Sequence, residues 1–475
     1  MHRTPLSQSP AFVPLLSFSI FSALFGTYEY PLALAFAISL LAPAGWVALG
    51  TERPNRSSLQ IAAVLLVLTL FGLLYISSVI SGNDDEPPRT IQGRGMVISS
   101  RRWGRGDVAL VGSDAGVLVL RLDPGSGLRG GDIVEFSGVS VRFRRADAPG
   151  AFDERLYWLA RGASCAVTVS SKRVVGRSFG PAAWRSALSR RISEVLPPRT
   201  AGYALASLTG ERDEIVSELH RLSGTSHILA VSGFHVGIVF AACWFFIKGF
   251  KFRLYAISVA IWLYVFLAGA PPSSIRAAFM IELMIAGRIA GRFGNYFNSA
   301  CAAGSMMLLV NPWLFWDIGW RLSMLAVLAL ASLASTGLGW LAKSALACPL
   351  AWLAASVQVA RSFGSVPLAG LIANYLSLPA FFVLFPASWC LSLPALLGVP
   401  GGNAASAIAE FLFERWEVLS LNILVICPWE TGFSIWLVLS CVSVLTYFFA
   451  CASGFSRERA ILAAGINFAG VCLLL

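Results

Sequence analysis

The most regular pattern along the chain is a series of long apolar stretches joined by short polar loops. The first three run from Phe12 to Thr27, Leu32 to Leu49 and Leu59 to Ile80. The others lie at 228–247, 254–270, 275–287, 296–315, 319–337, 345–360, 366–386, 433–452 and 460–475. Because a helix needs about 20 residues to cross a bilayer, the pattern predicts about ten to twelve membrane-spanning helices. A cleaved leader is not expected, because further apolar stretches follow the first one directly.

A different pattern occupies residues 83–178. Short runs rich in Val and Ile alternate apolar with polar positions and are separated by Gly and Asp: "GRGMVISSRR", "DVALVGS", "GVLVLRL", "GDIVEFSGVSVRF" and "SCAVTVSSKRVV". Before the last run, Phe152, Leu156 and Leu159 have the spacing of one face of a short helix. Strands in this number with one helix predict a small OB-like β-barrel, although an SH3-like barrel or a small sandwich would give nearly the same pattern.

The composition excludes a water-soluble fold. Hydrophobic residues make up 56% of the 475 residues and charged residues 13%, whereas soluble domains carry about 25% charged residues. The formal net charge is +11, and 26 charged residues, 15 of them basic, fall within 83–178. An Arg-rich domain of this kind favours polyanions or lipid headgroups, but a merely solvated surface would have the same composition.

The basic residues of the short loops predict the orientation of the helices. They are Arg3, Arg53, Arg56, Lys248, Lys251, Arg253, Arg288, Arg292 and Lys343. Short loops rich in Lys and Arg stay cytoplasmic, so the helices are expected in the cytoplasmic (inner) membrane with residues 83–227 outside the cytoplasm. We divide the chain into N-terminal transmembrane helices (1–82), the OB-like barrel (83–178), an amphipathic helix with a connector (179–227) and a polytopic channel domain (228–475).

Basic and aromatic residues alternate in two segments of the predicted barrel. The candidate DNA-binding residues are Arg101, Arg102, Trp103, Arg105, Arg142, Arg144 and Arg145, with Phe143 between the last three. Single-stranded nucleic acid binds in basic grooves with exposed rings on which bases stack. The alternative is that the aromatic rings pack into the barrel. After the barrel, Trp184, Leu188 and Ile192 form one face of a helix that we expect along the membrane surface or in a dimer contact.

Polar residues concentrate where the second group of apolar stretches begins. His227, Ser232 and His235 lie in "SHILAVSGFH", and polar groups at membrane depth usually face a bundle interior or a water-filled cavity. We therefore expect a helix break that lines a path. Three alternatives stay open: a metal site with His227 and His235, a nucleophilic Ser232 with His235 as base, and polar residues that only pack helices together.

Further polar residues occur in later apolar stretches. Arg276 and Glu282 share one stretch, and Asp317 and Arg321 have the i, i+4 spacing of a pair on one helix. Asn374 lies in a segment with several prolines, which predicts broken helices there. Residues 404–421, with three glutamates, predict a second interfacial helix. The candidate channel-lining or gating residues are His227, Ser232, His235, Arg276, Glu282, Asp317, Arg321 and Asn374.

The chain resembles the ComEC family of DNA-internalisation proteins used in bacterial transformation. The resemblance rests on "GTSHILAVSGFHVGIV", "PPSSIRAAFMIELMIAGR", "NPWLFWDIGWRLSMLAVL" and "FGSVPLAGLIANYLSLP", in this order, and on "APGAFDERLYWLARGASCAVTV" upstream. It implies passage of one DNA strand across the cytoplasmic membrane. Ser232 and His235 lie in the family's Ser-Gly-Leu-His-like segment, where Phe234 replaces the usual Leu.

The resemblance also implies partners. Larger family members carry a metallo-β-lactamase-like domain thought to be a nuclease, but no histidine follows His235, so its metal signature is absent. We therefore expect a transport protein without a cofactor or metal, assisted by a separate nuclease. Further expected partners are single-stranded DNA, the lipid bilayer, a cytoplasmic DNA-translocating ATPase or helicase, an outer DNA receptor and a second copy of the chain. The rival functions are an intramembrane metal-dependent hydrolase and an exporter or scaffold for envelope polyanions.

Overall fold

A computed structural model describes residues 10–27, 39–40, 56–81, 90–147, 151–249, 252–291, 295–452, 455–457, 460–461 and 463–465. The chain forms two compact units. The first unit comprises 1–84, 279–366 and 430–475, and the second comprises 85–278 and 367–429. The predicted span at 32–49 lies almost wholly outside the described residues, and so does most of the one at 460–475.

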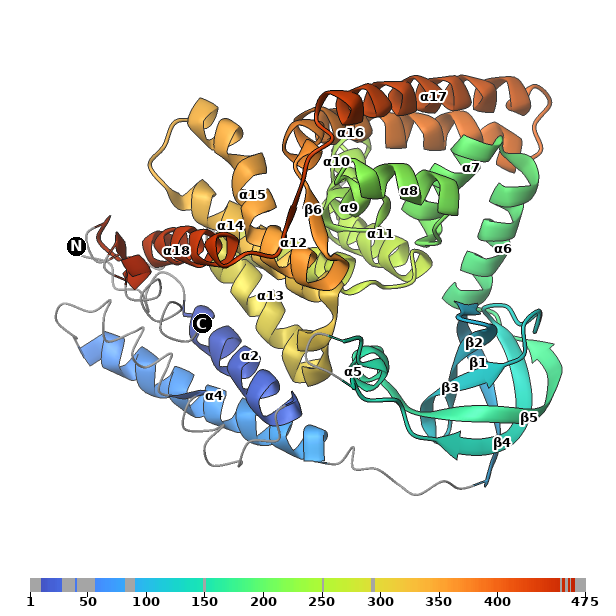
Figure 1. The fold of residues 1–475 in the computed structure, drawn as a ribbon, viewed down its shortest axis with the longest axis horizontal. Helices are drawn as coiled ribbons and strands as arrows, with labels where there is room; N and C mark the ends of the chain where they lie inside the picture. Colours follow the sequence, from blue (N-terminus) through green and yellow to red (C-terminus); the bar gives the residue numbers. More distant parts are fainter. Residues whose placement is uncertain are drawn as a thin grey trace. The chain divides into compact units, whose positions relative to one another are not determined.

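The first unit is helical (Figure 1). Its elements are α2 (Phe12–Thr27), α4 (Arg56–Ser81), the end of α12 (Pro272–Ile289), α13 (Tyr296–Val310), η2 (Pro312–Trp316), α14 (Ile318–Ser335), α15 (Trp340–Phe363), β6 (Ser365–Pro367), β7 (Glu430–Gly432) and α18 (Ile435–Ala452). Small and branched apolar residues on α14, α15 and α18, such as Ala329, Leu350 and Leu445, form one buried cluster. Helix α2 packs against α4 and α13.

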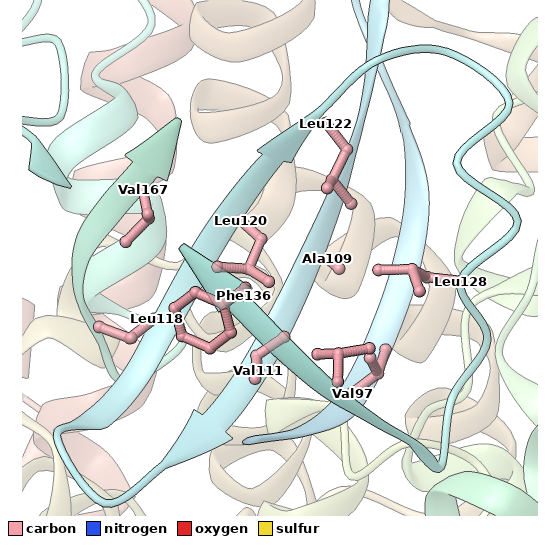
Figure 2. Close-up of a cluster of buried hydrophobic side chains, with 10 residues drawn as sticks. Val97, Ala109, Val111, Leu118, Leu120, Leu122, Leu128, Phe136 and Val167 are labelled. Atoms are coloured by element: carbon pink, nitrogen blue, oxygen red, sulfur yellow. The ribbon is translucent and has the colours of Figure 1, made fainter. Parts of the chain in front are cut away.

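The second unit begins with a closed five-stranded barrel, which confirms the predicted fold class. Its strands are β1 (Thr90–Trp103), β2 (Gly106–Ser113), β3 (Gly116–Leu122), β4 (Asp132–Val141) and β5 (Ala163–Arg177). The order around the barrel is β1-β2-β3-β5-β4, with β4 paired to β1 and β3 parallel to β5. Alternate apolar residues fill the interior, among them Val97, Val111, Leu120, Phe136 and Val167 (Figure 2).

Helices form the rest of the second unit. They are α5 (Glu154–Leu159), α6 (Pro181–Val195), α7 (Pro198–Ala204), the π-helix η1 (Leu205–Thr209), α8 (Glu214–Leu222), α9 (Ser226–Leu229), α10 (Gly233–Phe246), α11 (Arg253–Leu267), the start of α12, α16 (Ala369–Leu396) and α17 (Gly402–Ile426). Aromatic rings from α7, α16 and α17 dominate their core. The rings of Tyr203 and Phe413 stack with centroids 4.0 Å apart, and Phe381 packs beside both.

The prediction of broken helices around Asn374 is wrong for α16. This helix runs unbroken over 28 residues although Pro379, Pro386 and Pro394 lie inside it. A proline removes one backbone donor and disturbs one turn, and helices in apolar surroundings tolerate this cost where neighbouring groups pack around them. The break predicted near Gly364 is present, because α15 ends at Phe363 and Gly364 has a φ of +87°.

The two predicted surface helices differ in what covers their apolar faces. On α6, Ile192 is fully buried and packs with Leu188 against η1 and the end of α16, so the expected membrane-surface role of this face is wrong. On α17, the predicted apolar face is accessible, with Ile408 53% and Phe411 54% exposed, whereas Phe413 and Trp416 are buried. The interfacial role of α17 stays a prediction.

The protein is a multi-pass membrane protein. Among the described residues, four helices are long and apolar enough to cross a membrane: Ala63–Ile80 within α4, α14, α15 and α16. Shorter apolar helices are Phe12–Ala23, α10, α11, α13 and Leu437–Ala452. Helices α12 and α17 are as long but carry more charged residues. The total of ten to twelve spans stays a prediction.

Candidate functional site

The candidate DNA-binding residues lie in two loops of the barrel. Arg101 and Arg102 end β1 and Arg105 forms the turn to β2, whereas Arg142, Arg144 and Arg145 follow β4. All six arginines are exposed. In OB folds the β1–β2 and β4–β5 loops help to bind oligonucleotides. The strand order thus places these guanidinium groups on the loops that bind nucleic acid in other OB folds.

Trp103 packs against aromatic rings of its own domain. Its ring centroid lies 5.2 Å from those of Tyr157 and Trp158 and 5.9 Å from that of Phe152. The Arg101 guanidinium lies 5.0 Å from the Trp103 ring and also donates a hydrogen bond to the Tyr157 hydroxyl. Trp103 is only half-buried, so base stacking on this ring stays a prediction.

Helix α5 covers the outer face of β2 and β3. Val108 and Val119 of that face pack against Phe143 and Trp158, which are 8% and 2% exposed. This face is part of the oligonucleotide-binding surface in OB folds. Since α5 covers it here, the loops are left as the accessible part of that surface. Phe143 is thus unavailable for stacking.

Two acidic residues at the start of α5 fix its position. Asp153 caps the helix by accepting a hydrogen bond of 2.8 Å from the Leu156 backbone. Glu154 receives two hydrogen bonds of 2.9 and 3.0 Å from Arg121 of β3, which anchors the helix to the strand that it covers. The segment "FDERLYWL" therefore holds both the cap and the ring that cover the barrel face.

The predicted helix break around Ser232 is confirmed. Helix α9 ends at Leu229 and α10 begins at Gly233, with Ser232 in an extended conformation as the N-cap. The Ser232 hydroxyl accepts from the Phe234 backbone N–H at 3.3 Å. Ser273, at the start of α12, donates to the Val231 carbonyl at 2.7 Å and ties the break to the next helix.

His235 is fully buried beside this break. Its Nδ1 lies 3.5 Å from the Ser232 hydroxyl, the outer limit of a hydrogen bond, and its ring lies 4.9 Å from that of Phe385. Within the described ranges, Nε2 has no hydrogen-bond partner. Within the same ranges, no three His, Cys, Asp or Glu side chains are placed to hold a metal.

His220 has a role that its sequence position alone did not indicate. Its Nε2 lies 3.1 Å from the Tyr203 hydroxyl and its Nδ1 lies 2.7 Å from the Thr225 hydroxyl, and the ring is 1% exposed. Burial, with a smaller contribution from the nearby His227, lowers the pKa of His220 to about 4. The ring of His220 is therefore neutral at physiological pH. The spacing of His220 and Thr225 on either side of a helix end was the available signal.

Arg276 and Asn374 lie in the second unit with the histidines. Arg276 is 6% exposed, and its Nε and Nη1 have no partner among the described residues. Its Nη2 lies 3.3 Å from the position that a Cβ on Gly233 would occupy, so the guanidinium lies against the first residue of α10. The buried Oδ1 of Asn374 likewise has no partner within the described chain.

Glu282, Asp317 and Arg321 belong to the first unit instead. Asp317 caps α14 by accepting from the Trp320 backbone at 2.9 Å. Arg321 donates to the Phe315 carbonyl and lies over the Trp316 ring at 4.3 Å. The eight candidate lining residues are therefore divided between two units, and a single path lined by all of them stays a prediction.

A carboxylate cluster on α17 was also missed by sequence reasoning. Glu410 accepts hydrogen bonds from the Arg199 and Thr200 backbone N–H groups at 3.2 and 2.8 Å, and from the Thr200 hydroxyl at 2.9 Å. Glu417 pairs with the Arg199 side chain at 2.7 Å. These contacts place negative charge at the N-terminus of α7, where it stabilises the helix dipole.

The fold and these sites define a class: a multi-pass helical membrane protein that carries a five-stranded OB-like barrel and buried polar groups at a helix break. The family model described as "Competence protein" matches residues 207–459, and the chain belongs to this family. It is also 27% identical over 281 residues to ComE operon protein 3 of Bacillus subtilis (strain 168). That match covers 56% of this chain but only 33% of the relative. No solved structure matches the chain.

Proposed function

We propose that this protein is a channel for uptake of single-stranded DNA across the cytoplasmic membrane during natural transformation. The supporting observation is that His235, Arg276 and Asn374 bury polar atoms without partners among the described residues of the helical core. A buried polar group without a hydrogen bond costs about 1–3 kcal/mol, so such groups favour a place that a polar polymer occupies. Membership in the Competence protein family supports this function.

The barrel would collect the DNA before it enters the helical domain. The exposed arginines of its two loops neutralise phosphates with release of counterions, so binding weakens as the salt concentration rises. We place residues 83–227 outside the cytoplasm, where DNA arrives. Glu282, Asp317 and Arg321 would line the remainder of the path, and a separate nuclease and a cytoplasmic ATPase or helicase would act on the strand.

The deciding experiment compares uptake of fluorescently labelled DNA in cells that carry wild-type protein, no protein or the His235→Ala variant. We expect loss of uptake in the last two strains, because the variant removes a buried polar group beside the helix break. Immunoblots of the membrane fraction should show equal amounts of protein. Normal uptake in the deletion strain would exclude the function and favour an exporter or scaffold. If uptake is lost in the deletion strain but normal in the His235→Ala strain, His235 has no role in it.

A further inference from the structure

The start of α10 brings the partial positive charge of the helix dipole next to the full charge of an arginine, both inside the second unit. The first residues of a helix present N–H groups without intrahelical partners, and the helix dipole adds about half a positive charge there. The guanidinium of Arg276 lies against Gly233, the first residue of α10. Two like charges in a poorly solvated place repel each other strongly.

Nothing in the described chain neutralises this pair. The Arg276 side chain is only 6% exposed, and its Nε and Nη1 have no hydrogen-bond partner among the described residues. It also forms no ion pair with a described carboxylate. A buried unpaired charge is costly, because water no longer solvates it. An anion at the start of α10 would offset the repulsion and accept hydrogen bonds from the guanidinium.

Gly233 lets the Arg276 guanidinium approach the start of α10 closely. It has no side chain between the guanidinium and the helix start, and a Cβ there would lie 3.3 Å from Arg276 Nη2 and from Ala277 Cβ. The neighbouring His235 adds a second buried polar atom without a partner, its Nε2. A guanidinium matches two oxygens of a phosphate group, and helix N-termini bind phosphates through backbone N–H groups.

We infer that the N-terminus of α10 and the Arg276 side chain form a phosphate-binding site that takes one phosphodiester of the DNA backbone at a time. The inference rests on the proposed function for the source of the phosphodiester, but the site itself is defined by the geometry. A site that contacts only the phosphate does not read the nucleobases, so passage through it does not depend on the DNA sequence.

The test uses the purified full-length protein in detergent with dimethyl phosphate, which carries the charge of one DNA linkage. At constant ionic strength, the melting temperature Tm of wild-type protein should rise by a few degrees in a saturable way, because a ligand that binds only the folded state stabilises it. Arg276→Gln should lose this rise. The matched control Arg212→Gln removes an exposed arginine of the same unit and should keep it.

A second readout separates a binding role from a structural one. Without anion, Arg276→Gln should have a higher Tm than wild type, because it removes an uncompensated buried charge; a lower Tm would show that Arg276 already has a stabilising partner. Gly233→Ala keeps the charge but adds a methyl group at the site, so it should weaken the response to dimethyl phosphate.

Each remaining outcome has a defined meaning. If wild type shows no response, or Arg276→Gln responds equally, the site is excluded even if His235→Ala still abolishes uptake. A response to phosphatidylglycerol without one to dimethyl phosphate would assign the site to lipid headgroups and overturn the inference. If the site binds dimethyl phosphate but Arg276→Gln cells take up DNA normally, the proposed use of the site in transport fails.

Discussion

His220 is held as a neutral imidazole between α7 and the end of α8 by its bonds to Tyr203 and Thr225. Its folded-state pKa of about 4 lies below the value of 6.5 for an exposed histidine, so the unfolded chain binds the proton more tightly. The stability that this residue contributes is therefore complete above about pH 6.5 and is lost as the pH falls toward 4.

We expect the Tm of the purified protein to fall between about pH 7 and about pH 4.5, and His220→Gln to reduce this pH dependence. The full effect of this one residue is on the order of 3 kcal/mol. Thr225→Val is the control, since it removes one hydrogen bond but leaves the imidazole buried, so it should lower Tm and keep the slope. An unchanged slope in His220→Gln would contradict this account.

Glu410 joins α17 to the start of α7 through two backbone N–H groups and one hydroxyl. Glu410→Ala should lower the free energy of unfolding by about 1–2 kcal/mol, because it leaves helix-terminal donors unpaired. Glu414→Ala on the same helix removes a carboxylate whose partner is the adjacent, exposed Arg415 and should change stability by less than about 0.5 kcal/mol. Urea unfolding of the two variants measures the difference, and equal losses would be inconsistent with the cap.

At the scale of elements, α5 decides which barrel surface is accessible. Trp158 is 2% exposed and lies on the outer face of β2 and β3. Trp158→Ala should destabilise the barrel by about 3–5 kcal/mol. Limited proteolysis of the full chain should then show faster cleavage within 90–177. Phe152→Ala, which truncates a ring that is 60% exposed, should leave the cleavage rate nearly unchanged; similar rates for both variants would show that α5 does not protect the barrel.

The barrel and α16 show what a sequence pattern can predict about elements. The strands were predictable because each alternates apolar with polar residues in a way that a one-residue slip would destroy. Helix α16 was not, because the local effect of Pro379 or Pro386 is outweighed by packing partners far away in sequence. Sequence rules judge each proline alone, whereas the folded helix is stabilised as a whole.

At the scale of the whole molecule, the orientation in the membrane is the main open prediction. In a background without native cysteines, Arg105→Cys lies on an exposed turn of the barrel and Lys248→Cys follows α10. A membrane-impermeant maleimide should label Arg105→Cys in intact cells, and Lys248→Cys only after permeabilisation. The opposite labelling would place the barrel in the cytoplasm and reverse the proposed direction of entry.

The candidate site was predictable only in part for a related reason. The break at Ser232 and the buried His235 follow from residues adjacent in sequence. The capping of α7 by Glu410 joins residues more than 200 positions apart, and the bond from Tyr203 to His220 crosses a helix end. A single sequence carries no signal for such pairings, because each partner alone has an ordinary environment.

The π-helix η1 limits where the chain tolerates insertions and deletions. Ser207, at its centre, accepts a hydrogen bond from Tyr264 of α11 through its carbonyl and one from Trp389 of α16 through its hydroxyl. A π-turn holds one residue more than an α-turn, and each residue added or removed rotates the residues that follow in the same helix by about 100° around its axis. Loss of one residue from 205–209 would restore ordinary winding but turn Ser207 away from both partners, so insertions and deletions should be tolerated in nearby loops and rejected here.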